Sequence, residues 1–82
     1  MNEELIKKLS AKYPSNTMVD LWYKGKDISV KTDEHGNAVQ LLIGKRNHEG
    51  KIRGEKYVRS LELDDGGNVI KDEWHLKGRE DH

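Results

Sequence analysis

The chain has 82 residues, carries 15 Lys and Arg side chains against 15 Asp and Glu side chains, and contains no cysteine. This length suits one small domain spanning residues 1–82 and excludes a second one. The absence of cysteine excludes disulfide frameworks, thiolate zinc sites and thiol nucleophiles. Leucine, isoleucine and valine together number 18, so we expect a single, thin hydrophobic core.

The N-terminal segment has the apolar spacing of an amphipathic helix. Its stripe comprises Leu5, Ile6, Leu9 and Tyr13, which fall on one side of an α-helix. Asn2 is a suitable N-cap, and Pro14 cannot continue a helix. We therefore expect a helix over about residues 2–13, and a helix this short needs a second element to cover its apolar stripe.

After the helix the apolar period changes to two, and four groups of turn residues divide the chain. The first, Lys24-Gly25, suits a two-residue hairpin turn. The other three, at 33–37, 47–51 and 64–68, share a form in which Asp or Asn is followed three places on by Gly. In such a loop the first side chain bonds to the turn backbone and the glycine is left-handed. Four turns predict five antiparallel strands, at about 17–24, 26–33, 37–46, 51–63 and 68–77.

The loops also predict the strand register, because each one sets which residues lie opposite one another. In chain order they pair Leu21 with Ile28, Val30 with Gln40, Gln40 with Val58, and Val58 with Trp74. One face of the sheet then collects the expected core: Val19, Leu21, Tyr23, Ile28, Val30, Leu42, Val58, Ile70, Trp74 and Leu76. The predicted fold class is α+β, with the N-terminal helix packed on a five-stranded antiparallel β-meander that stays open or curls into a half-barrel.

The opposite face of this predicted sheet is unusually apolar. Its central residues are Trp22, Leu41, Ile43 and Tyr57, with His75 beside them. Exposed apolar side chains of this size mark partner surfaces, and aromatic residues contribute much of the energy at interfaces. We therefore predict a non-catalytic module for protein interaction or self-association. The alternative is that the sheet curls over this cluster, or that one strand register is wrong by one residue.

The equal numbers of charges hide an uneven distribution along the chain. Residues 45–59 carry a net charge of +4, and residues 60–82 carry a net charge of −4. The basic side chains are Lys45, Arg46, Lys51, Arg53, Lys56 and Arg59. Basic residues beside Tyr57 suit single-stranded nucleic acid, where phosphates and bases are contacted together. In the alternative interpretation, part of this positive charge is paired with acidic side chains of the neighbouring fifth strand.

No residue pattern points to catalysis, a metal or another cofactor, so we expect none of them. The four histidines have no metal-binding spacing, and the acidic loop that begins at Asp64 lacks the ligand alternation of a calcium loop. Met1 to Ser10 has charged residues where a signal peptide would have an apolar run. No apolar stretch has the length of a membrane helix. We expect a cytoplasmic protein.

Two parts of the sequence resemble known proteins. Val19, Leu21 and Gly25, together with Ile52-Arg53-Gly54 ahead of Tyr57-Val58, resemble the two motifs of Sm-like RNA-binding proteins. This resemblance implies a ring oligomer that binds uridine-rich RNA near Asn37 and Arg53.

Residues 54–78 are similar to a segment of small uncharacterised bacterial proteins. The similarity rests on Gly54, Tyr57-Val58-Arg59, Val69-Ile70-Lys71-Asp72, Trp74 and Lys77-Gly78. It implies a bacterial protein of a small family and carries no activity with it.

Overall fold

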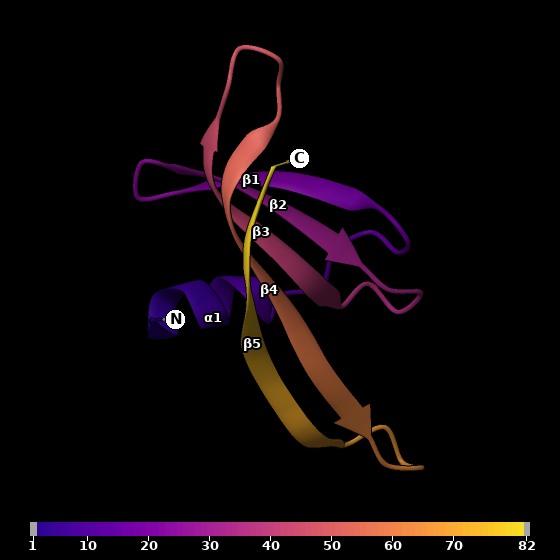
Figure 1. Ribbon diagram of the computed structural model, residues 1–82. Coiled ribbons are helices and arrows are strands. Elements are labelled where there is room, and N and C mark those ends of the chain that lie inside the picture. The colour runs from indigo at the N-terminus through magenta and orange to yellow at the C-terminus, as the bar shows by residue number, and fades with distance from the viewer. Residues whose placement is uncertain (1, 82) are drawn as a thin grey trace.

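The computed structural model describes the backbone of residues 2–81 and the side chains of residues 2–79. It contains one helix, α1 (Glu3–Leu9), followed by the strands β1 (Met18–Tyr23), β2 (Lys26–Thr32), β3 (Ala38–Arg46), β4 (Ile52–Leu63) and β5 (Val69–Asp81). The strands form one antiparallel sheet in the order β1-β2-β3-β4-β5 (Figure 1). The predicted α+β meander is confirmed, and the sheet does not close into a barrel. Over the described residues, no helix is long and apolar enough to cross a membrane.

The helix begins where the sequence predicts and ends earlier than predicted. The side chain of Asn2 accepts a hydrogen bond from the Leu5 N–H at 2.9 Å, as an N-cap does. The helix stops at Leu9, and Ser10 is its C-cap. Tyr13 instead donates its backbone N–H to the Gly36 carbonyl at 2.9 Å, which ties the chain to the β2–β3 turn. This long-range bond replaces the last predicted turn of helix.

The three Asp or Asn loops have the predicted conformation. In the β2–β3 loop, Asp33 Oδ1 accepts the backbone N–H groups of His35 and Asn37, both at 2.9 Å. Asn47 and Asp64 repeat this pattern in the other two loops. The glycine of each loop has a φ between 78° and 82°, a backbone region that favours glycine. These side chains therefore close their own turns.

The strand register is as predicted in two hairpins and wrong by one residue in the other two. Leu21 lies opposite Ile28, and Gln40 opposite Val58, as expected. Val30, however, lies opposite Leu41 and not Gln40, because a bulge interrupts the ladder next to Thr32.

A second bulge, next to Leu63, places Val58 opposite His75 and not Trp74. Because side chains alternate between the faces of a strand, the first shift turns β3 and β4 over, and the second turns β5 back. Ile70, which we predicted in the core, is 64% exposed in the part of the ladder that this second bulge disturbs.

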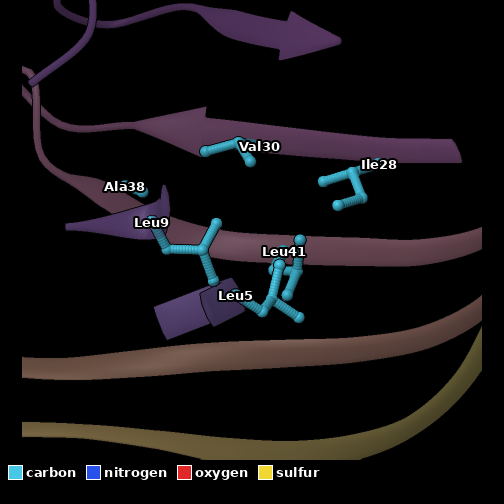
Figure 2. Packing of buried hydrophobic residues seen from close by; sticks show 6 residues of the cluster. All are labelled: Leu5, Leu9, Ile28, Val30, Ala38 and Leu41. Carbon is cyan, nitrogen blue, oxygen red and sulfur yellow. The ribbon is translucent and has the colours of Figure 1, made fainter. Parts of the chain in front are cut away.

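The hydrophobic core therefore lies between α1 and one face of the sheet, which we call the covered face. It comprises Leu5, Leu9, Ile28, Val30, Ala38 and Leu41 (Figure 2). The partly buried residues packed against it are Tyr13, Leu21, Tyr23, Ile43, Tyr57 and Trp74. Leu42 and Val58, predicted for this core, lie on the opposite face, which we call the open face. Leu76 lies opposite Tyr57 but is exposed, because it is on the edge strand β5.

β3 and β4 cross closely at a pair of glycines. Gly44 lies opposite Gly54, and a Cβ atom would stand 2.1 Å from the Arg53 carbonyl oxygen if added at Gly44, or 1.9 Å from the Ile43 carbonyl oxygen if added at Gly54. Only glycine allows the two backbones to approach in this way. Beyond this pair the β3–β4 hairpin projects from the body of the sheet (Figure 1).

The β4–β5 hairpin forms a two-stranded arm that extends from the other end of the sheet (Figure 1). The arm is joined to the body by Arg59, whose side chain makes a two-fold contact with the Asp72 carboxylate at 2.6 and 2.7 Å. The same guanidinium donates to the Ala38 carbonyl at 3.1 Å and lies 5.7 Å from the centre of the Trp74 ring. The Arg59 hydrogen bonds lower the pKa of Asp72, against a smaller opposing effect of partial burial.

Candidate functional site

The residues predicted to form one binding face lie on both faces of the sheet. Leu41, Ile43 and Tyr57 belong to the covered face, where they pack in or against the core. Their predicted exposure is wrong, and the physical reason is the bulge beside Thr32, which turns β3 and β4 over. The alternative of a register error, left open by the sequence, is therefore the correct one for these residues.

Trp22 and His75 remain on the open face but at its two edges. Trp22 lies on β1 and is 65% exposed, whereas His75 lies on β5, where it pairs with Glu73 at 3.3 Å. Four strand spacings separate these strands, a distance of about 19 Å in a flat sheet. The two side chains therefore do not form one cluster.

The open face instead contains a groove with a volume of about 260 Å³, which we call the open-face groove. It is lined by Met18, Ser29, Lys31, Gln40, Leu41, Leu42, Arg46, Gly50, Ile52 and Lys56. Leu42 and Ile52 are 8% and 1% exposed and supply apolar surface, although the helix is on the other side of the sheet. Among the lining side chains are three cations and no carboxylate. The groove thus combines an apolar floor with a basic rim.

One end of the groove exists because the β3–β4 hairpin is tied to the first hairpin. The Arg46 backbone N–H donates to Asp27 Oδ2 at 2.8 Å, and its guanidinium lies 3.3 Å from Asp20 of β1. Lys45 Nζ donates to the Gly25 carbonyl in the β1–β2 turn. These contacts hold the end of β3 against the first hairpin.

Two large apolar side chains of β1 lie on the open face, one in the groove and one beyond it. Met18 lines the groove and is 59% exposed. It lies on the same side of β1 as Trp22, four residues along the strand, because alternate residues share a face. Asp20 lies between them and faces the same way. The row therefore offers apolar contact around a single carboxylate that Arg46 neutralises.

The basic residues of 45–59 do not form one surface either. Arg46 and Lys56 line the open-face groove, whereas Lys45 and Arg53 lie opposite each other on the covered-face side. Arg59 is 7% exposed and joins the arm to the body. Lys51 lies at the hairpin tip, where its backbone N–H donates to Asn47. For Arg59 the alternative interpretation is the correct one, because its charge is paired with Asp72 of β5.

Lys45 and Arg53 belong to a second concave site, of about 530 Å³, which we call the basic cleft. Its cations are Lys24, Lys26, Lys45, Arg53 and Arg79. Asn2, Leu5, Tyr23, Ile43, Gly44, Gly54, Glu55 and Tyr57 complete its lining. The cleft is the part of the covered face that the short helix does not reach, since residues of the N-terminal end of α1 border it.

The loop acid and the histidines do not assemble into a metal centre within the described residues. Asp64 accepts the backbone N–H groups of Gly66 and Asn68 and the side-chain amide of Asn68, and these hydrogen bonds lower its pKa. His35 and His48 lie in separate loops, and His82 lies outside the described residues.

The sequence prediction missed most of the residues that the fold brings together. Trp22 was predicted for the binding face, but Met18, which the spacing alone places on the same face of β1, was not among the predicted site residues. Ile52 lines the groove next to the end of β3, which is held by contacts with the first hairpin that span about twenty residues of chain. Lys24, Lys26 and Arg79 lie outside the basic segment and join it only in the folded sheet.

Comparison of the chain with protein-family models, curated proteins and solved structures gives no match in any of the three.

Proposed function

We propose that the protein is a non-catalytic interaction module that binds a protein partner, or a second copy of itself, through the open face of its sheet. The observation that carries the proposal is the exposed pair of Met18 and Trp22 beside the open-face groove. Large apolar side chains next to a concave apolar floor are typical of interface anchors. We expect the partner to be a cytoplasmic protein.

The division of the sheet into two faces supports this proposal. The only helix among the described residues, α1, packs on the covered face, so no helix covers the open face. A sheet face without a covering layer is normally polar. Here it carries Leu42, Ile52, Met18 and Trp22, and its rim cations suit a partner segment with apolar anchors and some acidic residues.

Site-specific photo-crosslinking tests the proposal directly. A photoreactive benzoyl-phenylalanine replaces Trp22 in one variant and Ile6 in the matched control, because Ile6 is also apolar and exposed (39%) but lies on the helix. We expect position 22 to give a discrete adduct, either with another protein in cells or with a second copy in the purified sample. No adduct at position 22 in either setting, or the same adduct at position 6, would contradict the proposal.

A further inference from the structure

The basic cleft carries more cations than the open-face groove, and it is separate from that groove. Its described lining holds five cations and one carboxylate, Glu55. Glu55 is 3.9 Å from Arg79, and the nearby Glu4 pairs with Lys24 at 3.1 Å. Arg53 lies opposite Asp81 in the register. Lys26 and Lys45 are the cations of this cleft for which no carboxylate contact is found among the described side chains.

The geometry points to single-stranded nucleic acid as the ligand of the basic cleft, which we propose binds there through its phosphates. This inference does not depend on the proposed function, because the two sites lie on opposite faces of the sheet.

Exposure of the cations favours a chain of phosphates over a single small anion. The side chains of Lys24 and Arg79 are 63% and 73% exposed, and Lys26, Lys45 and Arg53 are also exposed. A site for one small anion needs donors that are buried and fixed, since water otherwise competes for each contact. Exposed cations contributed by three hairpins instead give several weak contacts that add up along a polyanion.

The other walls of the cleft favour nucleic acid over an acidic peptide. Tyr23 and Tyr57 line it, and aromatic rings beside basic side chains accept the flat bases of a single strand. A volume of about 530 Å³ falls in the size range of sites that hold one small molecule, which suits one nucleotide unit at a time. A duplex, with its bases stacked inside, offers no free base to such a cleft.

Fluorescence anisotropy with the full chain and labelled single strands of about ten nucleotides tests this inference. We expect binding at about 50 mM salt that weakens steeply at about 200 mM salt, because bound phosphates release counterions. The double variant Lys26→Glu/Lys45→Glu should weaken binding at least about tenfold and reduce the salt slope by about 0.7 for each lost contact. The variant Lys26→Arg/Lys45→Arg should bind as the original chain does.

The matched control is Lys8→Glu/Lys71→Glu, which makes the same change of net charge at exposed positions outside both the cleft and the open-face groove. It should change affinity by less than about threefold, since distant surface charges are screened by salt. Circular dichroism melts show whether each variant remains folded. Equal weakening by both double variants, absence of binding at low salt, or equally effective displacement by inorganic phosphate or by poly-glutamate would overturn the inference.

Discussion

Leu41 and Leu42 are neighbours in β3 and show how the two faces of the sheet differ. Both are buried, at 1% and 8% exposure, so burial alone does not distinguish them. Both border the open-face groove, but only Leu41 belongs to the core cluster under the helix. The comparison teaches that packing against the helix, and not low exposure, separates the structural face of this sheet from the face available for binding.

The largest expected effect comes from truncating the two leucines separately. Leu41→Ala should lower the free energy of unfolding by about 3–4 kcal/mol, because it leaves a closed cavity under the helix. Leu42→Ala should cost about 1–2 kcal/mol. Because the groove beside Leu42 is already open to water, this variant loses only the free energy of burying apolar surface and not an additional cavity term. Urea denaturation of both variants measures the difference. Equal losses would show that the open face is packed as tightly as the covered one.

A middle-sized effect is expected where the covered face meets the β4–β5 arm. Asp72→Asn should lower the free energy of unfolding by about 1 kcal/mol at neutral pH, because it removes the charge from the two-fold contact with Arg59. This small value reflects solvent screening, since the Asp72 side chain is 35% exposed.

The same pair predicts a pH dependence with a defined sign. The pKa of Asp72 is lower in the folded protein than its ordinary value of 3.8, so its contribution is fully present above that pH. It is lost as the pH falls through the lowered folded-state pKa. Denaturation series of the original chain and the Asn variant should therefore converge in acid. A difference that stays constant with pH would contradict the assignment.

The smallest effect is expected for the exposed tryptophan of the open face. Trp22→Ser should change the free energy of unfolding by less than about 0.5 kcal/mol, because the side chain is 65% exposed and contributes little to the fold. Thermal melts followed by far-ultraviolet circular dichroism give this value. A loss above about 1 kcal/mol would mean that Trp22 stabilises the domain itself and is not held available for a partner.

Most of the fold could be predicted from the sequence because its signals are local. The helix start at Asn2 and the closure of the loops at Asp33, Asn47 and Asp64 each depend on hydrogen bonds within five residues. The two bulges that shift the predicted register, beside Thr32 and Leu63, had no such signal. The residues next to them, Val39 and Ile70, are apolar and β-branched like ordinary strand residues.

The candidate site was harder to predict because two register errors follow from these bulges. One error turned β3 and β4 over and assigned Leu41, Ile43 and Tyr57 to the wrong face. The second error turned β5 back, so Trp74 was assigned to the correct face although two of the predicted registers were wrong. The groove and the cleft also depend on contacts between distant hairpins, which periodicity along the chain does not encode.

The close crossing of Gly44 and Gly54 bears on how this chain can change during evolution. A methyl group at either position meets the backbone of the opposite strand and not a side chain that could become smaller. No compensating substitution at the partner position can therefore relieve the clash, and the two sites are constrained independently. We expect distant relatives with this hairpin to keep both glycines ten residues apart, even where the surrounding charges and the partners they bind have diverged.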